Sequence, residues 1–392
     1  MKKPLTIAWV SDFPLEWLPD LPTPLQTLPR QHPATWQRVL LAELEKNPSV
    51  RLHILALRKQ FPHHFTFVRN GVTFHCLKTV GGLRASSFFW FDTLMINRTL
   101  RQIRPDLVHA WGTEKGAALV ASRLKYPHVV TMHGLLAWLA DLIPLNRYER
   151  FVAALERPSL RRLKNVTAES TFAVEYLRQR FPQLEVVQIE HAPNWIFHHV
   201  ERRPQLNPIR LICIGQLGYG KGSDLLFKAL DWLQDELAFE LIFVGRPDSK
   251  KAHRLVSSLS VELRSRINFK ENLSSREIAD ELAFATLMIH PTRADNSPNA
   301  VKEAVVAGVP VIASDIGGIP DYVFPGQNGF LFPPGDATAC LTAIRTACHH
   351  PLISKGLVDG STLEKTRDYL SPRKMGKGFW EVYQDAIQRH LG

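Results

Sequence analysis

The sequence PTRADNSPNAVKEAVVAGVPVIASDIGG, from Pro291 to Gly318, decides the fold of this chain. It predicts a helix that begins near Ser297 and Pro298, because serine suits an N-cap and proline suits the first helical position. Gly308 supplies a left-handed residue at the end of the helix, and VPVIA then forms a short apolar strand of the kind buried in parallel sheets. A loop, a helix and a buried strand in this order are typical of an α/β fold.

Two acidic residues frame the start of this helix, Asp295 in the loop and Glu303 eight positions later. The amide groups at a helix N-terminus favour anions, and carboxylates accept hydrogen bonds from hydroxyl groups. Together they predict a site for an anionic, polyhydroxylated ligand such as a nucleotide-sugar. The alternative is a well-capped surface helix that carries a solvated glutamate.

Length and composition indicate a globular protein of two domains. The chain has 392 residues, with 45% hydrophobic and 22% charged residues. No apolar run approaches the roughly 18–20 residues that span a bilayer. The N-terminal MKKPLTIAWVSDFP predicts a first buried strand and not a signal peptide.

The cysteines and the charge indicate the compartment and the class of partner. The four cysteines show no ligand spacing, which favours a reducing cytosol over a disulfide framework or a zinc site. Residues 1–190 hold 25 Lys and Arg against 15 Asp and Glu, whereas residues 191–392 hold 23 against 22. A basic half could meet an anionic substrate or membrane surface, or could simply aid solubility. No nucleic-acid module is visible, so we expect no nucleic-acid partner.

Short apolar strands alternate with helical periods along the whole chain. The strands are LTIAWV, RLHILAL, LVHAWG, HVVTMHG, NVTAES and VVQI, then IRLICIG, FELIFVG, INFKEN, ATLMIHP, VPVIASD and NGFLFPPGD. This pattern predicts two Rossmann-like, doubly wound α/β domains that face a central cleft. We expect an N-terminal domain (1–192), a proline-rich interdomain linker (193–208), a C-terminal domain (209–370) and a final helix that packs back on the N-terminal domain (371–392).

The strand IRLICIG leads into a glycine-rich loop, GQLGYGKG, that precedes a helix. Gly215, Gly220 and Lys221 fit a P-loop, but Gly222 stands where Mg²⁺ chemistry needs a hydroxyl, and Ser223 comes one position late. The loop also does not match the dinucleotide-binding fingerprint G-x-G-x-x-G, because Gly218, Gly220 and Gly222 read G-x-G-x-G. The loop is therefore interpreted as a diphosphate site without metal, with a plain glycine turn as the alternative.

Two smaller features follow predicted strands. FVGRP, which contains Gly245, is by itself only a turn at a strand end. His133 in HVVTMHG ends a strand of the first domain, where a lone histidine is more often structural than functional. Across a cleft from a diphosphate site, it becomes a candidate contact to a transferred group.

These motifs, in their order and spacing, resemble the retaining GT-B glycosyltransferases of family 4. The resemblance rests on GQLGYGKG, FVGRP, the D-x7-E pair, AGVPVIASDIGGIPDYV and NGFLFPPGD, which span nearly the whole second domain. In the first domain it is limited to PDLVHAWG, VVTMHG and AESTF, with HAPNWIF at the linker.

The resemblance implies a role for each matching residue. Glu303 would bind the donor ribose, Asp295 the hydroxyls of the transferred sugar, and Lys221 the diphosphate, while His133 would reach the donor sugar. The implied catalytic residues are therefore Lys221, Asp295 and His133. The implied donor-binding residues are Gly215, Gln216, Gly220, Lys221, Gly245, Asn296, Ser297, Asn299 and Glu303.

Several positions depart from the family pattern. Asp295 is one methylene shorter than the usual glutamate, and Gln216 replaces a frequent arginine, for which Arg246 or Arg293 could substitute. Pro298 cannot donate an amide hydrogen bond where family members often offer one. The loop after the first strand reads PRQHPATW and lacks the family's glycine pair.

The implied reaction moves a sugar from a nucleoside diphosphate to an acceptor hydroxyl with retention, without a cofactor or a metal. The resemblance implies that the first domain binds the acceptor and the second binds the nucleotide-sugar donor. The acceptor would be a glycan or a lipid-linked glycan used in cell-surface polysaccharide or lipopolysaccharide assembly. The aromatic run Phe88–Phe91 beside Arg84 is either core or an anchor for an anionic membrane, which would place a cytoplasmic protein at the inner membrane face. The alternatives are a non-catalytic nucleotide-sugar binding protein, a GT-B-type epimerase and a phosphorylase. Base selectivity is expected near residues 270–273.

Overall fold

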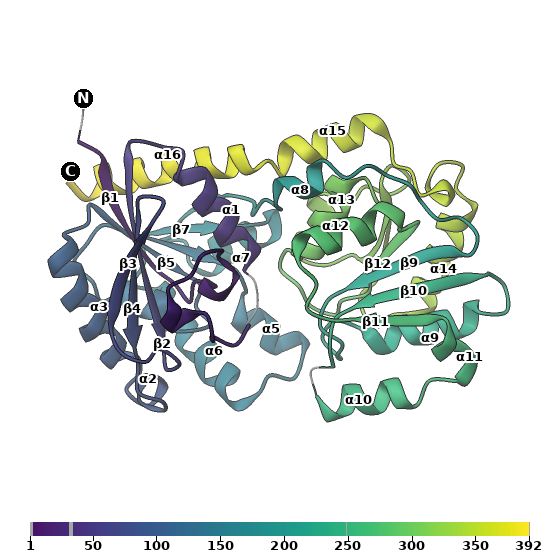
Figure 1. The fold of residues 1–392 in the computed structure, drawn as a ribbon, viewed down its shortest axis with the longest axis horizontal. Helices are drawn as coiled ribbons and strands as arrows, with labels where there is room; N and C mark the ends of the chain where they lie inside the picture. The colour runs from purple at the N-terminus through teal and green to yellow at the C-terminus, as the bar shows by residue number, and fades with distance from the viewer. Residues whose placement is uncertain (1–2, 31–33, 248, 392) are drawn as a thin grey trace. The chain divides into compact units, whose positions relative to one another are not determined.

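A computed structural model describes residues 3–30, 34–247 and 249–391, in two compact α/β units (Figure 1). The N-terminal unit comprises Met1–Glu169, Ala173–Glu190 and Pro372–Gly392, and the C-terminal unit comprises Ser170–Phe172 and His191–Ser371. Each unit is built on a mainly parallel sheet covered by helices, which confirms the predicted α/β class. Part of the loop PRQHPATW, residues 31–33, lies outside the described residues.

The N-terminal unit has an eight-stranded sheet in the order β3-β4-β2-β1-β5-β6-β7-β8. All its strand pairs are parallel except β3 with β4. These two strands form a hairpin around Asn70 and Gly71, both at positive φ, and they were not among the predicted strands. The strands are β1 (Leu5–Val10), β2 (Val50–Arg58), β3 (Phe65–Arg69), β4 (Val72–Lys78), β5 (Leu107–Trp111), β6 (His128–Met132), β7 (Asn165–Ala168) and β8 (Glu185–Gln188).

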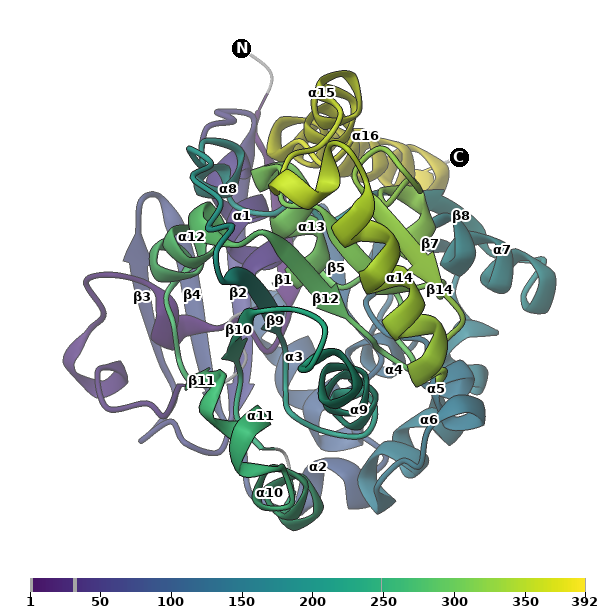
Figure 2. The same cartoon turned by 90° about the vertical axis from the view of Figure 1, so that its right-hand side faces the viewer.

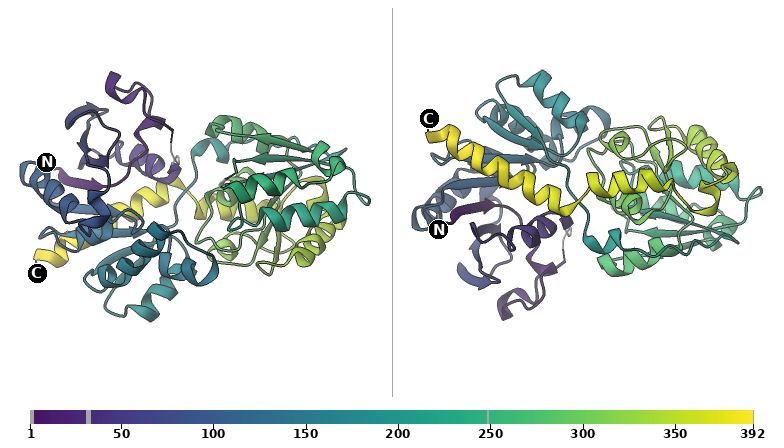
Figure 3. Two further views of the ribbon diagram at one scale, coloured as in Figure 1. Left: turned by 90° about the horizontal axis from the view of Figure 1, so that it is seen from below. Right: turned by 90° about the horizontal axis from the view of Figure 1, so that it is seen from above.

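The helices of this unit include the last one of the chain. They are α1 (Thr35–Leu44), α2 (Leu83–Ser86), α3 (Trp90–Ile103), α4 (Ala117–Ala121), α5 (Leu136–Leu142), α6 (Arg147–Leu160), α7 (Thr171–Arg180) and α16 (Pro372–Leu391), with short 3₁₀ turns at Leu15–Trp17 and Thr23–Leu25. Helix α16 packs against α1, β5 and β6, and Figure 3 shows it beside this unit from two further directions.

A buried hydrogen-bond network fastens α16 to the first sheet. The hydroxyl of Tyr383, which is fully buried, accepts a hydrogen bond from Trp9 Nε1 at 3.1 Å and lies 2.7 Å from His109 Nδ1. His109 Nε2 lies 2.6 Å from the hydroxyl of Thr131 on the next strand. The network therefore connects the C-terminal helix to β1, β5 and β6.

The C-terminal unit has a six-stranded sheet in the order β11-β10-β9-β12-β13-β14, in which all hydrogen-bonded neighbours are parallel. Strands β10 and β11 lie on one side of β9, and β12, β13 and β14 lie on the other side. The carboxyl ends of β9 and β12 thus flank the point where ligands bind in such sheets. The strands are β9 (Ile209–Ile214), β10 (Phe239–Val244), β11 (Ile267–Lys270), β12 (Leu287–His290), β13 (Val311–Ser314) and β14 (Gly329–Phe332).

Two apolar layers bury the faces of this second sheet. Helices α9 and α14 pack on one face, and α8, α12 and α13 pack on the other (Figure 2). The helices of the unit are α8 (Trp195–His198), α9 (Ser223–Leu233), α10 (Lys250–Ser257), α11 (Val261–Ser265), α12 (Ser275–Phe284), α13 (Asn299–Ala307), α14 (Ala337–His349) and α15 (Gly360–Tyr369), with 3₁₀ turns at Ile319–Asp321 and Ile353–Lys355.

Two local predictions are wrong. Residues 193–208 are not a free linker but part of the C-terminal unit, where α8 packs on α12 and α13 and the Arg202 guanidinium donates to carbonyls of residues 282–285 and Gly356. The N-cap of α13 is Pro298 and not Ser297. The Ser297 hydroxyl lies 3.3 Å from the hydroxyl of Tyr322, which holds it away from the helix amides. Gly308 does end α13 in the left-handed conformation, as predicted.

Replacing Tyr383 with phenylalanine should destabilise the N-terminal unit by about 1–3 kcal/mol, because Trp9 Nε1 would lose its buried acceptor. Urea unfolding followed by tryptophan fluorescence measures this loss. Gln384→Ala, an exposed neighbour on the same helix, should change stability by less than about 0.5 kcal/mol. Equal effects of the two substitutions would contradict the role of the buried network.

Candidate functional site

The loop after β9 folds back on the start of α9. The Ser223 hydroxyl accepts a hydrogen bond from the Gly218 amide at 3.1 Å, and Ser223 is buried. That hydroxyl is thus engaged within the loop. Gly222 has a φ of +69°, and a Cβ there would lie 1.8 Å from the carbonyl oxygen of Pro291. Only glycine allows the loop after β9 to lie directly against the loop after β12.

An ion pair joins these two loops at the point where the strand order reverses. Lys221 Nζ, from the loop after β9, contacts Asp295 Oδ2, from the loop after β12. The Asp295 side chain is 14% exposed, and His290 Nε2, at the end of β12, lies 3.7 Å from the same oxygen. Burial alone would raise the pKa of Asp295, but the neighbouring Lys221 and His290 hold it well below its usual range. Burial also lowers the pKa of His290.

A second cation in these loops, Arg293, is held by Asp224. The Arg293 guanidinium donates two hydrogen bonds to Asp224, at 2.6 and 2.7 Å, and a third to the carbonyl of Tyr219 at 2.7 Å. It also lies 3.9 Å from the centre of the Tyr219 ring. Arg293 therefore fastens the two loops together, and the structure does not favour it as the substitute for the missing family arginine. Arg246 is exposed after β10, so its side chain could reach a ligand.

Helix α13 carries the remaining acidic residue of the predicted site. Asn299 and Glu303 lie four positions apart and therefore on one face of the helix. Glu303 is 5% exposed. The side-chain oxygen of Asn299 is buried without a hydrogen-bond partner among the described residues. An orphaned buried acceptor at a helix start is typical of a position that receives a donor from a ligand.

The other predicted donor residues border the same loops. A Cβ on Gly245 would lie 1.8 Å from the carbonyl oxygen of Gly215, so the loops after β9 and β10 touch. Gln216 is exposed, and the carbonyl of Gly220 accepts from the Arg293 amide at 2.9 Å. Asn296 is buried, and its Oδ1 accepts from the Ser170 hydroxyl at 2.9 Å. This places Gly215, Gln216 and Gly220 on a loop that touches the loops after β10 and β12, while the Asn296 side chain contacts Ser170.

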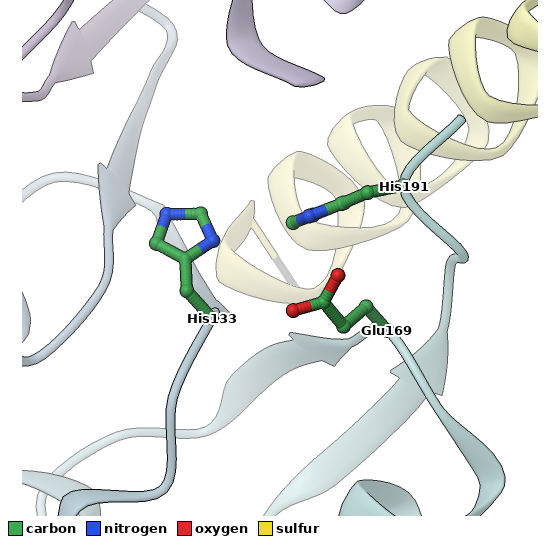
Figure 4. Close-up of side chains that lie close together, drawn as sticks. All are labelled: His133, Glu169 and His191. Carbon is green, nitrogen blue, oxygen red and sulfur yellow. The ribbon is translucent and has the colours of Figure 1, made fainter. Parts of the chain in front are cut away.

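His133 belongs to the N-terminal unit, directly after β6. Its ring lies 5.4 Å from that of Trp111 in a stacked geometry and 5.1 Å from that of Trp36. Figure 4 shows its imidazole near the carboxylate of Glu169, which follows β7, with their ligand atoms within 4.8 Å.

Sequence reasoning missed two features. His290 is one of them, although its position at the end of an apolar strand, directly before Pro291, indicated a polar side chain at the edge of a sheet. The other is a cavity of about 330 Å³ in the N-terminal unit, lined by charged residues that follow β1 and β5. The string GTEK directly after LVHAW was the available signal for it.

Two family models match the chain. Residues 38–196 match glycosyltransferase family 4, and residues 208–350 match the glycosyl transferases group 1. Both matches are to glycosyltransferase domains, and the two α/β units have the GT-B fold. The motifs at residues 215–222 and 295–303 fall within the second match.

Known proteins resemble the chain along most of its length. Sulfoquinovosyl transferase SQD2 of Arabidopsis thaliana is 25% identical over 69% of the chain, which covers 55% of that protein. Glycogen synthase of Mycobacterium tuberculosis is 24% identical over 79% of the chain and 75% of its own length. The sucrose-phosphate synthase structure from Thermosynechococcus elongatus has a TM-score of 0.80 at 16% identity, with 98% of this chain and 100% of that chain covered. HepE of Anabaena, solved with UDP and glucose, has a TM-score of 0.69 at 17% identity, with 97% and 100% covered.

Across the described ranges, no helix combines the length and the apolar character needed to cross a bilayer.

Acidification should weaken the C-terminal unit through Asp295. Because the folded pKa of this carboxyl is lowered, its contribution to stability is present above the unfolded pKa and is lost as pH falls below about 5. In Asp295→Asn, unfolding free energy should be lower at neutral pH and should change less on acidification. Urea midpoints between about pH 6 and 3.5 measure this. Parallel pH profiles for the two proteins would contradict the ion-pair assignment.

Proposed function

We propose that the chain transfers a sugar, with retention of anomeric configuration, from a nucleoside diphosphate to a hydroxyl of a glycan or lipid-linked glycan. The observation that carries this proposal is the ion pair of Lys221 and Asp295 at the strand-order reversal of the second sheet, with Glu303 on the helix that follows. HepE, a structural neighbour, was solved with UDP and glucose, which supports a donor of this kind.

The proposed roles follow from the position of each group. The start of α9 and Lys221 offer positive charge for the diphosphate, and Arg246 is the remaining exposed cation on the loop after β10. Asp295 accepts hydrogen bonds from hydroxyls of the transferred sugar, and Glu303 accepts them from the ribose. His133 keeps the role that the resemblance implies, a contact to the donor sugar. The loop at residues 270–273, whose Lys270 carbonyl accepts from the Gly245 amide at 2.8 Å, would select the base.

Retention is proposed to occur by attack on the face that the leaving group departs from. The bond between the anomeric carbon and the diphosphate oxygen breaks, the acceptor oxygen bonds to that carbon, and the acceptor proton passes to the departing phosphate. Lys221 and the amides at the start of α13 stabilise the charge on the diphosphate. Asp295 is a poor nucleophile in this position, because Lys221 lowers its basicity and holds one of its oxygens.

The proposed acceptor carries a lipid, and the exposed apolar side chains around α2 and α3 support this. Phe89 is buried at 1% exposure, so the aromatic run is partly core. Its neighbours Phe88, Trp90 and Leu94 are 52, 55 and 64% exposed. Arg123 lies 4.3 Å from the centre of the Trp90 ring. Apolar side chains beside cations are suited to the interface of an anionic bilayer.

We therefore propose a cytoplasmic protein at the inner face of the membrane, in cell-surface polysaccharide or lipopolysaccharide assembly. One relative is named a GDP-mannose-dependent alpha-(1-6)-phosphatidylinositol monomannoside mannosyltransferase, from Mycolicibacterium smegmatis, and is 26% identical over 48% of the chain. A putative teichuronic acid glycosyltransferase, TuaC of Bacillus subtilis, is 25% identical over 74%.

Thermal shifts with UDP, GDP, ADP and CMP, with and without EDTA, test the donor site. One nucleoside diphosphate should stabilise the protein by about 2–3 kcal/mol at well above its dissociation constant, whether or not EDTA is present. Glu303→Ala should abolish the shift, whereas Glu364→Ala, an exposed residue of α15, should leave it unchanged. No shift with any nucleotide would refute the donor assignment, and binding without transfer to any acceptor would favour a non-catalytic binding protein.

Co-sedimentation with liposomes tests the membrane proposal. Leu94→Glu should reduce binding to anionic vesicles several-fold, because it places a negative charge among the exposed apolar side chains. Val261→Glu, at an 89% exposed position of the C-terminal unit, is the matched control and should bind like the wild type. Binding that ignores lipid charge, salt and Leu94→Glu alike would count against a membrane surface here.

A further inference from the structure

Lys221, Asp295 and His290 meet at the strand-order reversal of the C-terminal sheet, and they differ in how freely each can move. Lys221 contacts Asp295 Oδ2, and His290 Nε2 lies 3.7 Å from the same oxygen. The side chain of Lys221 is 39% exposed, whereas those of Asp295 and His290 are 14% and 4% exposed. Lys221 is therefore the member of this group that can turn towards a ligand in solution.

The backbone around Asp295 is held in place. The Thr292 hydroxyl lies 3.2 Å from the carbonyl oxygens of both Gly220 and Ala294 and donates its hydrogen bond there. A Cβ on Gly317, which has a φ of +59°, would lie 2.0 Å from the carbonyl oxygen of Asp295. The loops after β9 and β13 therefore both pack against this segment. The carboxylate cannot follow a departing lysine and needs another positive partner where it stands.

His290 is the group in position to supply that partner. Its Nε2 is buried without a hydrogen-bond partner among the described residues, and 3.7 Å exceeds the usual range of about 2.7–3.2 Å for such a bond. Buried polar nitrogens are normally paired, so this arrangement indicates a second state in which the bond forms. Burial lowers the pKa of His290, and Lys221 lowers it further, which keeps the ring neutral while the lysine is in place.

We propose that His290 is a positioning residue of the donor site: when a diphosphate draws Lys221 away, a solvent proton adds to the His290 imidazole, and its Nε2–H donates to Asp295 Oδ2. The inference rests on the proposed transferase function, for which it explains how Asp295 stays ionised and in place. Departure of Lys221 removes a like charge from beside the ring and leaves it facing an unpaired carboxylate. Both changes favour the charged imidazole.

Burial of His290 opposes this charge, so the exchange costs free energy. A nucleotide-sugar avoids part of this cost, because its hydroxyls donate hydrogen bonds to Asp295 directly. A nucleoside diphosphate offers no such donors at that carboxylate. Binding of the diphosphate should therefore take up more protons than binding of the nucleotide-sugar with the same base.

The competing possibility is that Asp295 itself takes up the proton once Lys221 has left. Burial raises the pKa of that carboxyl, so its neutral form gains stability when the lysine is absent. The ordinary pKa of histidine exceeds that of aspartate by about 2.6, however, which favours the proton on His290. The two possibilities differ in which side chain changes charge, and that can be measured.

Other titratable groups lie on the elements that pack against β12, which are β9, β13 and α13. Arg210 is paired with Glu281 at 2.8 Å, and burial raises the pKa of Cys213 to about 12, so neither changes charge near neutral pH. Residues 311–314 of β13 include no titratable side chain. The groups on these elements are Arg210 and Cys213 on β9 and Lys302 and Glu303 on α13.

Lys221→Met imitates departure of the lysine without any ligand. Heteronuclear NMR of the histidine rings distinguishes neutral from charged imidazole, and the His290 signal is the one missing from His290→Gln. In Lys221→Met, His290 should bind its proton about tenfold or more tightly than in the wild type. The signal of His349, an exposed histidine of α14 assigned from His349→Gln, should titrate alike in both proteins.

Calorimetry in two buffers of different ionisation enthalpy measures proton uptake on binding of UDP, GDP and ADP at about pH 7. The diphosphate that binds should bring up to about one more proton onto the wild type than onto His290→Gln. Ionisation of the nucleotide itself contributes equally to both proteins, so the difference reports His290. His349→Gln should behave like the wild type, and a merely structural role of His290 would leave the proton count unchanged.

Three outcomes would overturn the inference. They are a His290 that titrates alike in wild type and Lys221→Met, protonation of Asp295 in place of His290 by carbon NMR of the carboxyls, and equal proton uptake by wild type and His290→Gln. Melting temperatures check that the variants are folded, with His290→Asn as the second substitution. The NMR series uses no nucleotide, so a chain that binds none refutes the donor site while His290 is still tested.

Discussion

The buried carboxylate of Asp295 is the constraint on which the C-terminal site depends. A carboxylate that loses most of its water must be paired, and Lys221 supplies the charge from the loop after β9. The pairing requires the two loops to approach closely, which Gly222 permits and the Arg293–Asp224 contacts maintain. The glycine loop and the start of α13 are thereby brought to one edge of the sheet.

The N-terminal unit repeats this construction with different chemistry. There too an ion pair, Asp12 with Lys115, joins the loops after the two strands at which the strand order reverses. The C-terminal loop is rich in glycine and precedes a helix start, which suits phosphate. In the N-terminal unit, Trp36 of α1, Trp111 of β5 and the Glu114 carboxylate instead line the cavity. The same backbone architecture thus carries two sets of side chains of different chemistry, because parallel strands direct their loops to one edge.

The sequence predicted features that depend on neighbouring residues, and it did not predict contacts between distant ones. Apolar runs located all six strands of the C-terminal sheet, and Gly308 marked the end of α13, because burial and backbone conformation depend on neighbouring residues. The hairpin of β3 and β4 was missed although its Asn70-Gly71 turn was visible. The engagement of Arg293 by Asp224, 69 positions away, was not visible, because a pairing of that range depends on which loops the folded sheet brings together. Residues 193–208 were misread for the same reason, since their prolines indicate an irregular segment but not what it packs against.

The ion pair also determines how the proposed site responds to a nucleoside diphosphate alone and to an intact nucleotide-sugar. If Lys221 turns to a diphosphate, Asp295 loses its closest cation and keeps only His290, whose pKa burial lowers. A nucleoside diphosphate alone would therefore leave a buried carboxylate poorly compensated, at a cost in free energy. A nucleotide-sugar brings hydroxyl donors to that carboxylate while its diphosphate takes Lys221. On the proposed roles, Asp295 therefore favours the intact donor over the product through the same ion pair that joins the two loops.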